Sequence, residues 1–231
     1  MNINDMNIIQ MTGKMEVTYY RSPVSKAVLY YSKKIVTIHY PDRDPVTVDV
    51  SVIPGEGISN YCMQFGIVLS DAGDLLFLQS WEKGLYCFEI ATGVLRWHYN
   101  LSRAFETATK DRLVFCRFVD KCLCVFDADT GALLKRRPMG VYTTLKVLSD
   151  NYFLSGPKRN KYEVLNWDLE VVEHIPVKEL NPYEDPNFCI LCGELSGNQL
   201  TISGWEKSKS PESTGGTDRF RRTVTLKYLT D

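Results

Sequence analysis

Apolar and polar residues alternate along two neighbouring stretches of the chain, and each stretch turns back on itself at a Thr-Gly pair. The first covers residues 85–97 and turns at Thr92-Gly93; the second covers residues 123–135 and turns at Thr130-Gly131. Alternation with a period of two is typical of a strand with one buried face. A glycine supplies the positive φ that a tight hairpin needs. The pattern therefore predicts a β-hairpin that is repeated.

A second signal, a short polar turn followed by an apolar strand, recurs five times. It is found at Ser25-Lys26, residues 71–74, Lys110-Asp111, Asp150-Asn151 and residues 196–198. The repeat is roughly 40 residues long, which is the length of a four-stranded propeller blade. We therefore expect an all-β chain that forms one β-propeller domain over residues 1–231.

Five blades can be assigned, at roughly residues 15–52, 61–100, 104–138, 143–178 and 188–229, and the first four have four strands each. The fifth has three strands, the last at residues 223–229, with a Ser- and Gly-rich loop expected over residues 206–218. A spare apolar segment, residues 7–12, precedes the first blade. We predict that it pairs beside residues 223–229 and closes the ring, since an open propeller would leave exposed strand edges.

The two hairpins share further residues with a known repeat. An acidic residue precedes each Thr-Gly turn, and a tryptophan follows the first one; the residues concerned are Glu89, Thr92, Gly93 and Trp97, then Asp127, Thr130 and Gly131. This pattern resembles the pyrroloquinoline-quinone-type and WD-like propeller repeats over about a third of the chain. Lys135 stands at the second tryptophan position. The resemblance speaks for propeller geometry and hardly for a bound cofactor.

Charge and composition narrow the possible partners. The net charge of −1 gives no overall attraction to nucleic acid or to an anionic membrane. No apolar run approaches the roughly 20 residues that span a bilayer, and the first residues lack a secretory pattern. The seven cysteines are an odd number, and several lie in apolar strands. We expect a reduced, cytoplasmic monomer that binds neither nucleic acid nor membranes.

Residue types that could carry catalysis are sparse. Cys189 and Cys192 form a Cys-x-x-Cys pair, but an extended strand would point the two thiols to opposite faces. The three histidines fall in different blades, and no phosphate-binding loop or nucleophile motif is visible. Glu16 and Glu106 on the innermost strands are the sole candidates for a carboxylate pair in a central channel. We therefore predict no catalytic residue, no metal and no cofactor.

A four-residue sequence pattern that occurs in two blades indicates a binding surface instead. Ser80-Trp81-Glu82-Lys83 in the second blade returns as Gly204-Trp205-Glu206-Lys207 in the fifth. Both are expected in the hairpin between the second and third strands, where a tryptophan can anchor a partner. The alternative is a tryptophan tucked between blades. The predicted partner-binding residues are Trp81, Glu82, Lys83, Lys121, Arg159, Tyr183, Trp205 and Glu206.

These features favour a non-catalytic intracellular propeller that binds another protein. A compact binder of this kind suits a neutralising or regulatory role, such as that of an immunity protein against a toxin enzyme; this step is an analogy. A five-bladed lectin is the alternative, although it would need similar sugar pockets in every blade. A glycoside-acting enzyme is a third reading.

Overall fold

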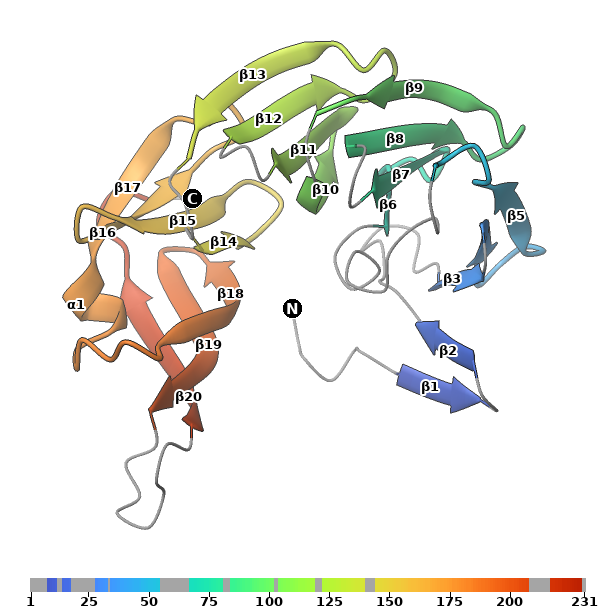
Figure 1. Cartoon of the computed structure of the whole chain (residues 1–231). Helices are drawn as coiled ribbons and strands as arrows, with labels where there is room; N and C mark the ends of the chain where they lie inside the picture. Colours follow the sequence, from blue (N-terminus) through green and yellow to red (C-terminus); the bar gives the residue numbers. More distant parts are fainter. Residues whose placement is uncertain are drawn as a thin grey trace. The chain divides into compact units, whose positions relative to one another are not determined.

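The computed structural model of the chain is nearly all β (Figure 1). It describes residues 8–11, 14–17, 28–32, 34–54, 67–80, 84–101, 104–118, 122–139, 144–207 and 217–229. These residues form twenty strands and one short helix, α1 (Val177–Leu180). Within the same ranges no helix is long and apolar enough to cross a membrane. The chain divides into two compact units, residues 2–138 and residues 139–231, and we take each by itself.

The unit of residues 2–138 contains four antiparallel sheets, in each of which the strands follow one another in chain order. The small sheet pairs β1 (Ile8–Met11) with β2 (Lys14–Val17). The next sheet is three-stranded, with β3 (Val28–Ser32), β4 (Ile35–His39) and β5 (Val46–Asp49). Two four-stranded sheets follow: β6 (Ile67–Leu69), β7 (Leu75–Ser80), β8 (Gly84–Glu89) and β9 (Leu95–Tyr99), then β10 (Ala104–Lys110), β11 (Leu113–Phe118), β12 (Cys122–Asp127) and β13 (Leu133–Pro138).

The unit of residues 139–231 contains two more antiparallel sheets. One is four-stranded, with β14 (Thr144–Val147), β15 (Phe153–Lys158), β16 (Lys161–Leu165) and β17 (Val171–Pro176). The other is three-stranded, with β18 (Cys189–Ser196), β19 (Gln199–Lys207) and β20 (Thr217–Thr225). The four-stranded antiparallel sheet in chain order is the repeating unit of a propeller.

The repeated hairpin predicted from the Thr-Gly pairs is confirmed. In the β8–β9 turn, the Thr92 hydroxyl donates a hydrogen bond to the Glu89 carboxylate at 2.7 Å. The Gly93 N–H donates to the Glu89 carbonyl at 2.9 Å. The corresponding bonds of the β12–β13 turn, within residues 127–131, also measure 2.7 and 2.9 Å. The two glycines have φ of 69° and 72°, so each turn uses the left-handed conformation that glycine tolerates best.

Burial on both faces of β7 and β8 shows how the sheets stack in the first unit. One face, with Leu76, belongs to an apolar cluster that includes Val36 of β4. The other face, with Phe77, belongs to a cluster that includes Phe126 of β12. The sheet β6–β9 is therefore covered by a neighbouring sheet on either side, which is how propeller blades pack.

The second unit has its own apolar core. Leu154 and Val164 of the sheet β14–β17 share a buried cluster with Leu200 and Ile202 of β19 and with Phe220 of β20. All five side chains are at most 8% exposed. Only one face of the sheet β18–β20 contributes to this core.

The ends of the chain differ from the sequence-based expectation. The strand β2, expected to begin a four-stranded first blade, pairs with β1, so that β3–β5 is a three-stranded sheet. The segment expected to close the ring forms β1 and pairs locally. The number of blades, the closure of the ring and the single domain over residues 1–231 stay predictions.

The last strand also begins earlier than predicted. β20 covers Thr217–Thr225 instead of residues 223–229, and residues 217–222 pair with residues 202–207 of β19. Alternating charged residues in this stretch hid a strand whose apolar positions, such as Phe220, face the core.

Candidate functional site

Half of the predicted partner-binding residues can be placed. Trp81, Glu82, Lys83 and Lys121 lie outside the described residues. The side chains of Glu16 and Glu106, the candidates for a channel carboxylate pair, lie outside them too. The other four predicted binding residues, Arg159, Tyr183, Trp205 and Glu206, belong to the unit of residues 139–231.

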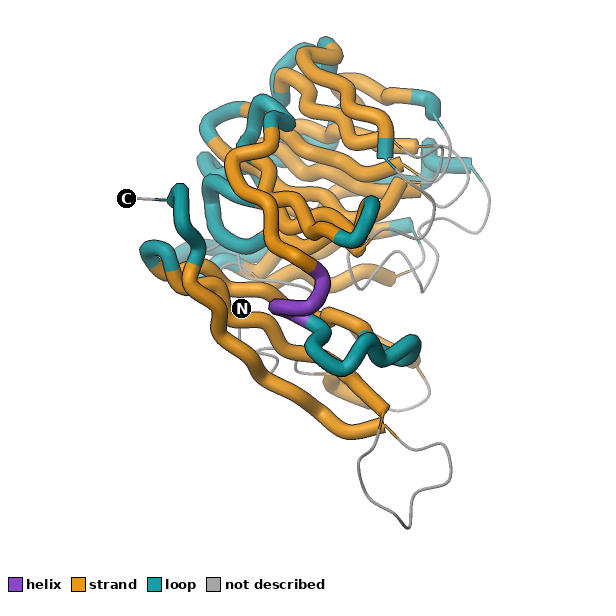
Figure 2. The backbone as a smooth tube through the Cα atoms, turned by 90° about the vertical axis from the view of Figure 1, so that its left-hand side faces the viewer, coloured by secondary structure: helices purple, strands orange, loops and turns teal. Residues whose placement is uncertain are grey.

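A short turn and the helix α1 bring two of these residues to one end of this unit. Arg159 and Asn160 form the β15–β16 turn, with φ of 49° and 63°. The N–H of Val177, where α1 begins, donates to the carbonyl of Asn160 at 3.0 Å. The chain then leaves α1 directly into the loop of residues 181–188 (Figure 2). The turn with Arg159 is therefore fixed beside the helix that leads to Tyr183.

Hydrogen bonds hold the loop of residues 181–188, which we call the Tyr183 loop. The buried Asn181 side chain donates to the carbonyl of Asp185 and accepts from its N–H, both at 3.0 Å. The Asp185 carboxylate accepts hydrogen bonds from the backbone N–H groups of Lys207 and Asn187. These bonds, the one from Lys207 first, lower the pKa of Asp185. The loop is thereby bonded both to itself and to the end of β19.

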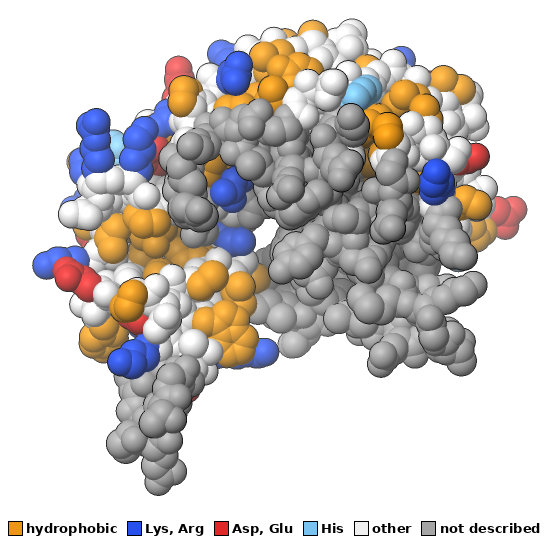
Figure 3. Space-filling model, in the orientation of Figure 1, with side chains coloured by type: hydrophobic (Ala, Val, Ile, Leu, Met, Phe, Trp, Pro, Cys, Tyr) orange, Lys and Arg blue, Asp and Glu red, His pale blue; other side chains and the backbone are white. Residues whose placement is uncertain are grey.

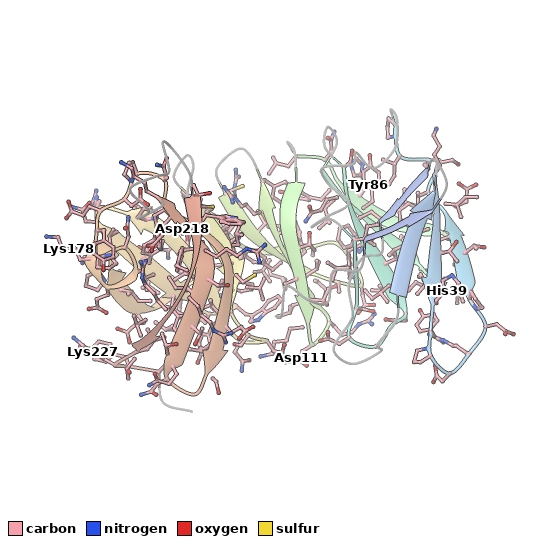
Figure 4. All side chains as sticks on the ribbon, turned by 90° about the horizontal axis from the view of Figure 1, so that it is seen from below. His39, Tyr86, Asp111, Lys178, Asp218 and Lys227 are labelled. Carbon is pink, nitrogen blue, oxygen red and sulfur yellow. The ribbon has the colours of Figure 1, made fainter. Side chains whose placement is uncertain are left out.

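Tyr183 is the most exposed aromatic side chain of this loop. It is 65% exposed, whereas Phe188 at the far end of the loop stacks on Phe220 with ring centroids 4.7 Å apart. Lys178 and Glu184 form an ion pair beside it at 3.4 Å. Lys178 extends outward from the edge of the unit (Figure 4). The loop therefore presents one aromatic ring together with charges of both signs.

Arg222 packs against this loop. Its guanidinium forms an ion pair with the carboxylate of Glu206, and Nη1 donates to the carbonyl of Leu180 at 2.9 Å. Its Cζ lies 4.7 Å from the ring centroid of Phe220 and 5.9 Å from that of Tyr183. The side chains of Arg222 and Glu206 are 19% and 9% exposed. Glu206 therefore lies under the surface, and a direct role in binding stays a prediction.

Trp205 lies inside β19 and not at a hairpin tip, so this expectation was wrong. The strand continues to Lys207 because residues 205–207 pair with residues 217–219 of β20. Trp205 is half-buried, and the Cζ of Arg219 lies 5.0 Å from its ring centroid. Since Glu206 points to the core side of the sheet, Trp205 points to the opposite face. Figure 3 shows apolar side chains beside single basic and acidic ones on this unit.

The two cysteines of the Cys-x-x-Cys pair share one face, contrary to the expectation. Cys189 is opposite Trp205 and Cys192 is opposite Ser203, with a bulge at Leu191 between them. Trp205 and Ser203 are two residues apart on one strand, so both cysteines lie on their side of the sheet. All cysteines among the described residues are free thiols. In those ranges no three metal-binding side chains come together.

Buried thiols elsewhere have raised pKa values. Burial raises the pKa of Cys87 and of Cys124 to about 12, so both stay protonated at neutral pH. They pack as apolar side chains within the cluster that also holds Phe126. The absence of catalysis, of a cofactor and of a metal remains a prediction.

The sequence did not reveal the part played by Arg222. Its partner Glu206 lies sixteen residues away, across a polar stretch that resembles a loop. The available signal was the spacing of Phe220 and Arg222, which places both on one side of a strand. This spacing can be recognised only if the strand is taken to begin at Thr217.

Comparison with known proteins gives the fold. No protein-family model matches the sequence, and no curated protein matches it. Among solved structures, the chain is similar to BamB from Moraxella catarrhalis, with a TM-score of 0.52, 15% identity, and coverage of 83% of this chain and 56% of BamB. It also matches the computationally designed Ika8 protein, with a TM-score of 0.48, 15% identity, and coverage of 77% and 55%. The chain thus spans little more than half the length of these structures. BamB is a β-propeller, and the chain shares that fold.

Proposed function

We propose that this chain is a non-catalytic propeller that binds another protein, and that the Tyr183 loop is its main contact surface. The observation that carries the proposal is an aromatic side chain, 65% exposed, on a loop that is held by hydrogen bonds on both sides. Tyrosine anchors many protein interfaces because its ring buries a large area while its hydroxyl can still form a hydrogen bond.

The hydrogen bonds that hold the loop favour binding, because the loop loses little conformational freedom when a partner binds. An immobilised side chain or loop costs free energy on association, and a loop that is fixed beforehand avoids that cost. The surroundings of Tyr183 also fit, because the ion pair of Lys178 and Glu184 places both signs of charge beside it. Such a mixture is typical of protein interfaces and unlike a uniformly basic nucleic-acid groove.

The finer role that we propose is neutralisation or regulation of a single partner, as an immunity protein does for a toxin enzyme. This step remains an analogy. The cytoplasmic location and the monomeric state are proposals of the same kind. The lectin and the glycoside-acting enzyme stay alternatives without a supporting observation among the described residues.

The test is a quantitative affinity capture from the native cell with four forms of the full chain: the wild type, Tyr183→Ala, Trp205→Ala and Thr92→Ala. Thr92 lies in a Thr-Gly turn of the other unit and serves as the control. We expect a protein that is captured by the wild type and by Thr92→Ala, and is reduced at least tenfold by Tyr183→Ala with unchanged thermal stability. Equal capture by all four forms would overturn the assignment, and selective binding on a glycan array would favour the lectin.

A further inference from the structure

The strand β20 has the position of a third strand, and its second edge has no strand paired to it among the described residues. The sheet order is β18-β19-β20, whereas the other sheet of the same unit continues from its third strand, β16, to a fourth, β17. There the fourth strand pairs along Lys161–Leu165. The place next to β20 is thus the place that an outer strand occupies in a complete sheet.

β20 is unlike the strands that end the complete sheets. β13 and β17 are six residues long and finish with a proline, Pro138 and Pro176, and β9 has five residues. Short length and proline are common ways to protect a sheet edge, because proline cannot donate to a further strand. β20 has nine residues and no proline. Its edge is long and regular enough to accept another strand.

The side chains of β20 define what that strand must carry. On the face away from the core, Arg219 and Arg221 are exposed and stand two residues apart, with Thr223 next in line. The Cζ of Arg219 lies 5.0 Å from the Trp205 ring centroid, and Arg221, which is 72% exposed, lies 3.8 Å from the Glu194 carboxylate. On the core side, Phe220 and Val224 belong to the apolar cluster, and Arg222 between them pairs with Glu206. A strand beside β20 would place its alternate side chains next to these two rows. Acidic residues therefore fit one face of the incoming strand, and apolar residues fit the other.

We infer that β20 is an open edge that takes up an extended segment of a partner protein, with acidic residues at alternate positions and apolar residues between them. This mode, in which a peptide completes a sheet, uses main-chain hydrogen bonds for affinity and alternate side chains for specificity. The exposed arginines also discourage two copies of β20 from pairing, since like charges would face each other. The inference rests on the proposed protein-binding function for the source of the segment.

Residues 7–12 of this chain fit the edge less well. They carry no charged side chain to match Arg219 and Arg221. Four of them, Ile8–Met11, are already paired with Lys14–Val17 as β1 and β2. Charge complementarity therefore favours an acidic segment from another protein.

The test uses the full chain and a fluorescent ten-residue peptide in which Glu and Val alternate, with binding followed by anisotropy. A peptide with Lys in place of Glu and a Glu peptide with alternate amides N-methylated serve as controls. We expect the Glu peptide to bind at least tenfold more tightly than either control. The double variant Arg219→Glu/Arg221→Glu should reverse the preference between Glu and Lys peptides. Arg136→Glu, an exposed arginine on β13 of a complete sheet, should leave it unchanged.

Hydrogen exchange of the alternate β20 amides that point away from β19 supplies a second measurement, since strand addition should slow their exchange and binding by charge alone should not. Equal binding of the N-methylated peptide would overturn the inference. So would protection, without peptide, of the alternate β20 amides that do not face β19, because residues 7–12 or a second copy would then fill the edge. Tyr183→Ala is expected to leave peptide binding unchanged, so this inference and the proposed function can fail separately.

Discussion

The indole Nε1 of Trp97 donates a hydrogen bond of 2.9 Å to the backbone carbonyl of Ala128. Trp97 belongs to β9, and Ala128 opens the Thr-Gly turn of the next sheet. The indole also lies against Gly131, where a Cβ would come within 2.6 Å of the Trp97 ring. The closing tryptophan of one repeat therefore packs on the Thr-Gly turn of the following repeat. This contact gives a structural reason for the pairing of the two motifs in the sequence.

The first prediction compares two glycines that occupy the same position in the two turns. Gly131→Ala should destabilise the protein more than Gly93→Ala, although φ is nearly equal at the two sites, 72° and 69°. The left-handed conformation costs an alanine about 1–2 kcal/mol in either turn. At Gly93 nothing lies within 4 Å of the new Cβ, whereas at Gly131 the indole must move. The overpacking adds about 1–3 kcal/mol.

Urea denaturation followed by circular dichroism measures both free energies of unfolding. Equal losses for the two variants would mean that Trp97 adapts freely, and that the packing of the indole on the turn contributes little.

The second prediction concerns the hydrogen bond itself. Trp97→Phe keeps an aromatic ring near Phe77 and Phe126 but removes the donor to Ala128. We expect a loss of about 1–3 kcal/mol, because a part-buried carbonyl loses its partner and the smaller ring leaves space. Trp167→Phe is the matched control, since its Nε1 bond of 2.7 Å to the Asp150 carbonyl is exposed and water can replace it. A larger loss for Trp167→Phe would contradict this order.

The sequence was sufficient for the regular hairpins of the fold. The geometry of a turn such as Thr92-Gly93 is set by neighbouring residues, because the hydroxyl, the carboxylate and the glycine that form it lie within a few positions of one another. The strands on either side alternate clearly, so β7–β9 and β11–β13 lie close to where they were expected. Local signals of this kind need no knowledge of distant partners.

What the sequence could not provide depends on long-range pairing. The bulge at Leu191 turns Cys189 and Cys192 to one face. No residue type in that stretch predicts a bulge. Trp205 looked like a hairpin residue because polar residues follow it. Its strand pairing with Arg219 depends on a segment fourteen positions away in the sequence. The candidate site was therefore predicted through Tyr183 and Arg159, while its support at Arg222 was missed.

The third prediction concerns pH. The Thr130 hydroxyl and backbone N–H donate to the Asp127 carboxylate at 2.7 and 2.8 Å, and these bonds lower the pKa of Asp127. The folded state therefore favours the ionised carboxylate. Its stabilising contribution is complete above the ordinary pKa of 3.8 and is lost as the pH falls through the lower, folded value.

Thr130→Val should raise the pKa of Asp127 in the folded protein, and Thr130→Ser should restore it. Carbon-detected NMR titration of the carboxylate measures the shift directly. In acid unfolding, the wild type should lose more stability than Thr130→Val below pH 3.8. An Asp127 pKa that is unchanged in Thr130→Val would show that the hydroxyl contributes nothing to it.

The fourth prediction tests the ion pair under the Tyr183 loop. Arg222→Met leaves the carboxylate of Glu206, which is 9% exposed, without its guanidinium partner. Removing one member of a buried ion pair costs about 3–5 kcal/mol, because a buried charge loses its oppositely charged partner. Arg221→Met is the matched control, since Arg221 is 72% exposed and lies 3.8 Å from Glu194. That pair is accessible to solvent, and its loss should cost less than about 1 kcal/mol.

The double variant Arg222→Met/Glu206→Met separates the ion pair from the packing of the two side chains. If the cost of Arg222→Met comes from the Glu206 carboxylate losing its guanidinium partner, removing that carboxylate as well should recover part of the stability. Unfolding in urea measures the four corners of the cycle, and hydrogen exchange of residues 181–188 reports on the loop. We expect faster exchange of these residues in Arg222→Met, because the bond from Nη1 to the Leu180 carbonyl is lost. Additive costs in the cycle, with unchanged exchange of residues 181–188, would mean that Arg222 does not support the Tyr183 loop.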